Sequence, residues 1–323
     1  MTQEAQTTPL VLAVPDLAEA TDYFTQRLGF RLQMIVPADT PQLALLSGQG
    51  VTLRLETEQR ALAEDATEPA SFIISRASTD EAWHEGRVEM QYRDLLPGRL
   101  GGQFIASHIR IPDGGLTSDY VHYHKVRFQI IYCKAGWVRV VYEDQGSPFL
   151  MKAGDCVLQP PEIRHRVLEA SPGLEVIEVS APAVHETWVD HEMQLPTRHV
   201  LPGRLFGDQQ FLLYRANAAS WKPWRWDGFE VSDTGVATAT DGMASVRFLK
   251  ASKDTVTFTQ KHVGEFLFYF VLQGTVDFER RNEGTKHLVA GDSCVVPAGL
   301  NYRLRARAGL ECLEVSLPAV AAV

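Results

Sequence analysis

The chain of 323 residues contains the same module twice. Residues 173–184 (GLEVIEVSAPAV) return 136 positions later as residues 309–320 (GLECLEVSLPAV). Upstream, Gly154-Asp155 and Pro160 return 137 positions later as Gly291-Asp292 and Pro297. An offset that stays nearly constant through several residue types is typical of a duplicated structural unit. We therefore expect two tandem units of the same fold.

A second match suggests where each unit begins. Residues 96–100 and 201–205 both read LPGRL, at an offset of only 105. The shorter offset predicts about thirty extra residues (136 − 105) before the core of the second unit. This insertion would include Trp221, Trp224 and Trp226, which either stack on an aromatic substrate or, as is more common, cover a core or an interface.

Each unit is expected to consist of short strands. Residues 128–133, 137–142 and 174–179 are rich in β-branched and aromatic side chains. Turns containing Gly136, Gly146 and Gly154 separate them, and no convincing amphipathic helix lies between. The pattern predicts antiparallel sandwiches or barrels.

Composition narrows the class of protein. With 45% hydrophobic and 22% charged residues, the chain is not disordered. The polar start is no signal peptide, and no run approaches the ~18 apolar residues of a membrane span. A net charge of −9 argues against a nucleic-acid binder. The four cysteines (Cys133, Cys156, Cys294 and Cys312) form no C-x-x-C pattern, so we expect a cytoplasmic protein without disulfides.

The first unit contains a pattern of metal-binding side chains. His122 and His124 are two residues apart, so on a strand both imidazoles point to one face. Gln129 follows on the next strand, and His165 returns from a third. Three imidazoles and an amide oxygen that converge inside a small β structure would form a site for a divalent transition metal.

These residues resemble the two motifs of the cupin superfamily. The first motif, G-x5-H-x-H-x3,4-E-x6-G, matches His122, His124, Gln129 and Gly136, with Gly115 one residue out of place. The second, G-x5-P-x-G-x2-H, matches residues 154–165 and ends at His165, with Glu162 in place of the inner glycine. The resemblance implies a mostly β fold of two tandem cupin barrels, of the double-stranded β-helix or jelly-roll type, at residues 91–195 and 196–323.

The resemblance also implies the metal ligands His122, His124, Gln129 and His165, and one divalent transition metal per chain. Iron or zinc is favoured over nickel or manganese. Gln129 stands where the family usually has glutamate, so four neutral ligands would leave a site charge of +2 that attracts an anionic substrate oxygen. Gln129 either ligates the metal or lies beside it and hydrogen-bonds a ligand.

The second unit lacks this ligand set. Gln260 and His262 fall on the two histidines of the first motif, and Tyr302 replaces the histidine of the second. One imidazole with an amide and a phenol is a poor divalent site, so we expect a degenerate cupin that is retained for stability, with a small-molecule pocket or a weak metal site as the alternative. If Tyr302 points inward, then Arg303, Arg305 and Arg307 point outward.

The first 60 residues differ from both units. A strand at 9–14, a helix from Asp16 to Leu28 and strands at 30–36, 43–46 and 51–55 resemble one βαβββ half of the vicinal-oxygen-chelate (glyoxalase/bleomycin-resistance) fold. Residues 61–90 would be a linker or covering segment. A half-module must cover its open sheet, either against the cupins or across a two-fold axis. The second arrangement predicts a homodimer.

The function expected from these features is that of a metal-dependent enzyme. A dioxygenase-like oxidoreductase acting on a small enolisable or aromatic oxygenated compound fits the ligand charge best. A zinc-type Lewis-acid isomerase, cyclase or hydrolase is the close alternative. The third possibility is a non-catalytic module in which the metal organises a small-molecule pocket, because cupin folds support very different chemistries.

Overall fold

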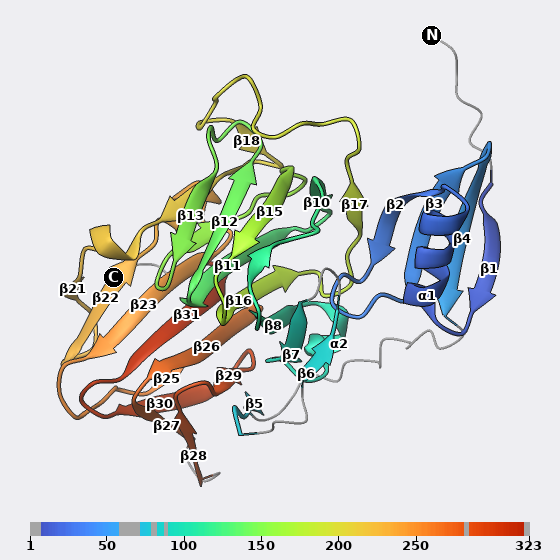
Figure 1. The fold of residues 1–323 in the computed structure, drawn as a ribbon. Coiled ribbons are helices and arrows are strands. Elements are labelled where there is room, and N and C mark those ends of the chain that lie inside the picture. Colours follow the sequence, from blue (N-terminus) through green and yellow to red (C-terminus); the bar gives the residue numbers. More distant parts are fainter. Residues whose placement is uncertain (1–7, 58–71, 79–82, 87–89, 281–283, 320–323) are drawn as a thin grey trace.

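A computed structural model describes residues 8–57, 72–78, 83–86, 90–280 and 284–319. The chain is mostly β, with two jelly rolls of two facing sheets each and a small α+β module in front of them (Figure 1). This is the predicted fold class. Within the described part of the chain, no helix is long and apolar enough to cross a membrane.

The first jelly roll, called the first unit, is built from strands of the green part of Figure 1. One sheet contains β17 (Thr187–Val189), β10 (His122–His124), β15 (His165–Ala170), β12 (Trp137–Tyr142) and β13 (Phe149–Lys152), with β9 (Gly115–Leu116) beside β15. The facing sheet has the order β20 (Leu212–Tyr214), β14 (Cys156–Leu158), β11 (Phe128–Ala135), β16 (Leu174–Ala181), β8 (Ile105–Ile111), β7 (Gln91–Asp94) and β6 (Trp83–Glu85).

The second jelly roll, the second unit, repeats this order. Its smaller sheet contains β24 (Thr255–Val256), β30 (Asn301–Ala306), β27 (Thr275–Arg280) and β28 (Gly284–Val289), with β25 (Gln260–Lys261) beside β30. Its larger sheet has the order β21 (Lys222–Pro223), β22 (Phe229–Asp233), β23 (Ser245–Ala251), β31 (Glu311–Leu317), β26 (Phe266–Gln273), β29 (Ser293–Val295) and β5 (Ile73–Ser75). The duplication inferred from sequence is therefore a duplication of structure.

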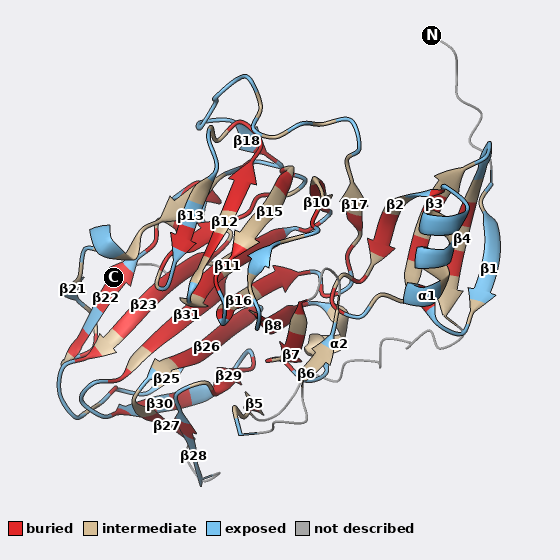
Figure 2. Cartoon of the chain, viewed as in Figure 1, coloured by how far each residue is buried: buried red, intermediate tan, exposed pale blue. Residues whose placement is uncertain are grey.

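The larger sheets of the two units pack face to face. Side chains alternate along each strand, so one face points into its own unit and the other toward its neighbour. On β11, Phe128 and Ile130 join an apolar core that also contains Phe266 and Phe268 of β26. The rings of Phe104 and Phe266 stack across this interface with centroids 4.2 Å apart. Figure 2 shows these strands as a largely buried block in the centre of the molecule.

The N-terminal module follows the predicted element order. It contains β1 (Leu10–Val14), α1 (Leu17–Asp22) continued by a π-helical turn (Tyr23–Arg27), β2 (Arg31–Val36), β3 (Leu43–Gly48) and β4 (Val51–Thr57). Asp16 caps the helix by accepting from the Glu19 amide at 2.9 Å, as its position predicts. Its likeness to half of a vicinal-oxygen-chelate domain stays a prediction.

The module's sheet has the order β1-β4-β3-β2 and continues into the first unit. Strand β2 pairs with β17, and β17 pairs with β10. One edge of the N-terminal module is therefore covered by the first unit of the same chain, which is the first of the two arrangements considered from sequence. The module lies beside the first unit, at the right of Figure 1.

Each unit lends a short strand to the other. The first arm, residues 72–77, precedes the first unit in sequence, yet its strand β5 pairs with β29 of the second unit. The second arm, residues 211–216, carries β20, which pairs with β14 of the first unit. The predicted domain boundaries at residues 60, 90 and 195 stay a prediction. Each of these two strands pairs with a strand on the other side of the boundary at residue 195. Residues 61–71, 79–82 and 87–89 of the predicted linker lie outside the described residues.

Matching acidic residues hold both arms. Asp292 binds the Arg76 guanidinium at 2.7 Å and the Ala77 amide at 2.8 Å. Its repeat mate Asp155 binds the Arg215 guanidinium at 2.8 Å and the Ala216 amide at 3.0 Å. The Gly-Asp match in the sequence thus marks the points where the arms are held.

The interpretation of the LPGRL repeat was wrong. In the first unit this stretch leads into α2 (Arg99–Gly102), between β7 and β8. The element at the same place in the second unit is α3 (Val236–Ala239), between β22 and β23. Residues 201–205 instead end at β18 (Leu205–Phe206), which pairs with β19 (Gln209–Gln210) ahead of the second arm and a 3-10 turn (Ala216–Ala218). A five-residue match at a different offset was therefore coincidental, and it does not mark an insertion.

Candidate metal centre

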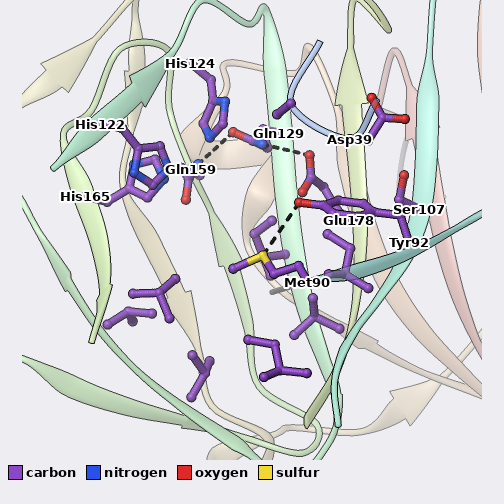
Figure 3. A pocket seen from close by; sticks show the side chains of 18 of the residues that line it. Asp39, Met90, Tyr92, Ser107, His122, His124, Gln129, Gln159, His165 and Glu178 are labelled. Atoms are coloured by element: carbon purple, nitrogen blue, oxygen red, sulfur yellow. Dashed lines mark hydrogen bonds between the residues drawn. The ribbon is translucent and has the colours of Figure 1, made fainter. Parts of the chain in front are cut away.

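Three histidines meet in a cavity inside the first unit. His122 and His124 lie on β10, and His165 starts β15, directly opposite His122 in the strand register. All three are buried, and they offer ligand atoms within 4.8 Å of one another. Figure 3 shows the rings turned toward a common point. The sequence spacing thus predicts correctly which imidazoles converge.

Hydrogen bonds on the far side of the rings orient them. The Nδ1 atoms of His122 and His165 lie 2.8 Å and 3.0 Å from the carbonyl oxygens of Tyr120 and Ile163. Because a carbonyl can only accept, both Nδ1 atoms carry the proton and both Nε2 atoms carry the lone pair. His124 Nδ1 lies 2.9 Å from Thr187 Oγ1 on β17. This is the arrangement found around metal-binding histidines, so the group fits a divalent transition metal.

Gln129 lies on β11 and lines the same cavity. Its Oε1 accepts from Gln159 Nε2 at 2.7 Å, and its Nε2 donates to Glu178 Oε1 at 2.9 Å (Figure 3). Gln159 in turn accepts from the Tyr142 hydroxyl at 2.9 Å. An amide oxygen has two lone pairs, so the bond from Gln159 leaves one for a metal. Direct ligation by Gln129 stays a prediction.

Sequence reasoning missed several residues of the cavity. The carboxylate of Glu178 on β16 points into it, beside Gln129 (Figure 3). The ring of His185 lies 5.4 Å from that of His124, and its Nδ1 lies 2.9 Å from the carbonyl oxygen of Pro182. A usable signal existed for Glu178 alone, because it shares a strand face with the apolar Val176 and is repeated as Glu314.

The N-terminal module also reaches the cavity. Asp39, in the connection between β2 and β3, is buried and lines it together with Ala38. The Asp39 carboxylate binds the Arg99 guanidinium at 2.5 Å. No pattern in the first 60 residues pointed to this contact, since it depends on how the module docks.

The remaining walls are apolar. The cavity has a volume of about 100 Å³ and is lined by branched side chains from both sheets, among them Ile105, Ile109, Ile131, Val140, Val167 and Val176. Burial raises the pKa of the nearby Cys133 to about 12, so its thiol stays protonated and is a poor nucleophile at neutral pH. The lining suits a small, largely apolar molecule that presents oxygens to one end.

The second unit has no equivalent histidine group. Gln260 pairs with Tyr302 in the register in which His122 pairs with His165, which confirms the alignment inferred from sequence. In the described part of the chain, the three histidines of the first unit are the only group of three or more potential metal ligands (His, Cys, Asp or Glu). Strand β30 alternates exposed and buried residues, so Arg303 and Arg305 point outward as predicted.

No protein-family model matches the chain, and no curated protein matches its sequence. Solved structures do match. Salicylate 1,2-dioxygenase from Pseudaminobacter salicylatoxidans is 19% identical, with a TM-score of 0.54 over 70% of this chain and 75% of that one. A structure of this enzyme in complex with gentisate has a TM-score of 0.57 at 17% identity, over 77% and 83% of the two chains.

Oxalate decarboxylases match to the same degree. The formate complex of the Lactobacillus farciminis enzyme is 14% identical, with a TM-score of 0.58 over 79% of this chain and 89% of that one. The Bacillus subtilis enzyme is also 14% identical, with a TM-score of 0.57 over 80% and 79%. These neighbours are two-cupin proteins, and the likeness shows that this chain has the two-cupin fold with a buried histidine triad that could bind a metal.

Proposed function

We propose that the chain is a metal-dependent cupin enzyme, and specifically a dioxygenase-like oxidoreductase for a small enolisable or aromatic oxygenated compound. The observation that carries the proposal is the buried triad of His122, His124 and His165, whose outer nitrogens are held by Tyr120, Ile163 and Thr187. Structural neighbours that act on salicylate or oxalate, both small carboxylates, support the choice of a small oxygenated substrate.

The three histidines, with Gln129 as a fourth ligand, would hold one divalent metal per chain. We favour iron, and zinc is next. Bound there, iron would supply a place for two substrate oxygens and electrons for O₂, whereas zinc would supply Lewis-acid polarisation of a carbonyl. Four neutral ligands leave the site a charge of +2, so a deprotonated substrate oxygen is bound in preference to a neutral one.

Glu178 is the residue of this cavity that could take the substrate proton. Its Oε1 accepts from Gln129 and from the Ser180 hydroxyl, each at 2.9 Å, while its Oε2 has no hydrogen bond among the described residues. A substrate hydroxyl near the histidines could donate to Oε2 and leave the proton there. The bonds from Gln129 and Ser180 would keep the carboxylate oriented for this step.

The cavity walls set the size and polarity of the substrate. About 100 Å³ of space suits a small molecule, and the branched apolar side chains bind a ring or a short carbon chain. Polar side chains lie at the histidine end and at Asp39, where the N-terminal module closes the cavity. A substrate with two adjacent oxygens would place them at the histidines and its carbon skeleton against Ile131 and Val176.

The test is the metal content of anaerobically purified protein, followed by O₂ uptake with gentisate, salicylate and small diketones. We expect about one iron per chain and O₂-dependent turnover. The His122→Ala variant should lose both, and His199→Ala, which changes an exposed histidine, should lose neither. Zinc with turnover independent of O₂ would favour the Lewis-acid alternative. Protein that binds no metal even after reconstitution would disprove the proposal.

A further inference from the structure

The second unit contains a cavity of its own, about 240 Å³ in volume. It lies at the place where the first unit has its histidines, since Gln260 and Tyr302 in its wall are the counterparts of His122 and His165. The polar side chains that line it are Arg225, Gln260, Lys261, His262, Tyr269, Tyr302 and Glu314. These groups do not repeat the metal site, so their chemistry must be considered separately.

In the part of the chain that the structure describes, a buried carboxylate oxygen in this cavity lacks a donor. Glu314 is 1% exposed; its Oε2 accepts from the Tyr269 hydroxyl at 2.7 Å, but its Oε1 has no hydrogen bond to a described residue. Nη1 of Arg247 is 3.7 Å from Oε1, too far for a hydrogen bond. A buried acceptor without a partner is destabilising, and more so when it is charged.

Comparison with the first unit shows which donor is missing. Glu178, the repeat mate of Glu314, receives the Gln129 amide, and Gln129 pairs with Ser180 in the strand register. In the second unit Leu267 pairs with Ser316 at the same place. Leucine cannot donate a hydrogen bond, so the carboxylate oxygen that would correspond to the acceptor of the Gln129 amide is left unsatisfied in the second unit.

A second polar atom in the cavity is also unsatisfied. His262 is 5% exposed, and its Nε2 has no partner among the described residues. Burial lowers the pKa of this imidazole to about 4, so it is neutral at pH 7 and can donate or accept. Two unsatisfied buried groups in one cavity indicate a polar ligand that is larger than a single hydroxyl.

The charges around the cavity favour an anion. Inside the unit the carboxylates of Glu314 and Asp233 both face Arg247, with Asp233 Oδ2 3.2 Å from its Nε, which leaves one negative charge to set against the other cations of the cavity. Arg225 lies against the rings of Trp224 and Trp226, 5.2 Å and 5.1 Å from their centroids, and has no carboxylate partner among the described residues. Exposed Lys261 adds a second positive charge to the lining. The uncompensated charge is therefore positive.

We propose that the second unit binds a small hydroxycarboxylate. Its carboxylate would lie at Arg225 and Lys261, its hydroxyl would donate to Glu314 Oε1, and His262 Nε2 would make a further hydrogen bond. Trp224 and Trp226 would then position the Arg225 guanidinium for the ligand as well as covering the core. The proposal concerns a site in the second unit and does not depend on metal binding in the first.

The test uses full-length protein and three matched probes in isothermal titration. 3-Hydroxybenzoate has both groups, benzoate lacks the hydroxyl, and 3-hydroxybenzamide lacks the charge. The His122→Ala background removes metal-dependent binding in the first unit, so that the signal comes from the second. We expect one site per chain for 3-hydroxybenzoate, with binding at least about tenfold weaker for each of the other probes.

Two variants check the contacts. Leu267→Gln supplies Glu314 with the amide of the first unit, and should weaken 3-hydroxybenzoate to the level of benzoate. Arg225→Gln should remove the preference for 3-hydroxybenzoate over 3-hydroxybenzamide, whereas Arg303→Gln on the outer face should change nothing. Metal content and turnover measured with these substitutions alone, with His122 in place, should equal those of wild type, which separates this proposal from the proposed function.

Three results would overturn the proposal. The first is no binding of 3-hydroxybenzoate at millimolar concentration. The second is equal affinity in the wild type, Leu267→Gln and Arg225→Gln proteins. The third is loss of the binding in the His122→Ala background, because the ligand would then occupy the first unit.

Discussion

At the scale of single residues, the candidate metal centre depends on atoms that would not touch a bound metal. An imidazole is a ligand only if the nitrogen facing the metal carries the lone pair, and a partner on the other nitrogen selects that tautomer. Backbone carbonyls do this for His122 and His165. For His124 the partner is the hydroxyl of Thr187, a completely buried side chain. This side-chain partner can be changed by mutation.

We predict that Thr187→Val weakens metal binding about 10–100-fold, because it removes the hydrogen bond to His124 while keeping the side-chain shape. Competition with a chelator of known affinity measures the effect. Thr187→Ser keeps the hydroxyl and should bind metal nearly as well as wild type. Equal metal affinity in all three proteins would show that Thr187 has no part in orienting the ligand.

The histidines were predictable from sequence because their spacing follows strand alternation. His122 and His124 share a face by parity, and His165 has a motif of its own. Glu178, Gln159 and His185 were not predicted. Glu178 carries a weak signal as the counterpart of Glu314 in the repeat, whereas Gln159 and His185 lie outside the strands, in segments that no local pattern assigns to the cavity.

At the scale of elements, the exchanged arms contribute to the core of the opposite unit. Phe72, at the start of the first arm, packs on the second unit, with its ring 5.6 Å from Phe278 and 6.3 Å from Tyr302. Strand β5 then completes the larger sheet. A segment predicted from sequence to be a linker or covering segment is thus part of a core whose other residues lie more than two hundred positions later in the chain.

We predict that Phe72→Ala lowers the free energy of unfolding by about 2 kcal/mol, less than for a fully buried phenylalanine because this ring is only partly buried. Urea unfolding measures it. Phe258→Ala, which removes a 62% exposed ring from the second unit, should leave the urea midpoint unchanged. If the two variants behave alike, the arm contributes no stability.

The strand content and the duplication could be read from the sequence, whereas the arms could not. Residues 72–77 (FIISRA) and 211–216 (FLLYRA) share a phenylalanine and Arg-Ala, but a match over six residues is short, and short strands give little signal against a polar background. The coincidental LPGRL match also predicted the wrong start for the second unit. What identifies the arms is the pair Asp155 and Asp292, and their role is visible only once the strands are placed.

At the scale of the whole molecule, the N-terminal module is part of the first unit's sheet and part of its cavity wall. Its β2 edge is covered by β17, but on β1, the outermost strand, Leu10, Val11 and Leu12 are 57%, 59% and 39% exposed. An exposed apolar edge strand is prone to pair with another chain. The homodimer expected from sequence therefore has a candidate surface.

We predict that the protein has twice the mass of one chain in light scattering at micromolar concentration, and that Val11→Lys makes it monomeric. A lysine on an edge strand blocks pairing by charge and solvation. Leu116→Lys, at an exposed position outside the N-terminal module, is the matched control and should remain dimeric. A monomeric wild-type protein would contradict the prediction.

The two exchanged arms also show how this chain differs from an oligomer of single units. Two units that exchange arms through equivalent contacts have the arrangement of a symmetric, strand-swapped pair of subunits, here joined covalently. Joining them makes their association independent of protein concentration, because each arm finds its acceptor within the same molecule. It also frees the two halves from having identical sequences. One half could keep three histidines while its partner replaced two of them, a division of labour that identical subunits encoded by one sequence cannot achieve.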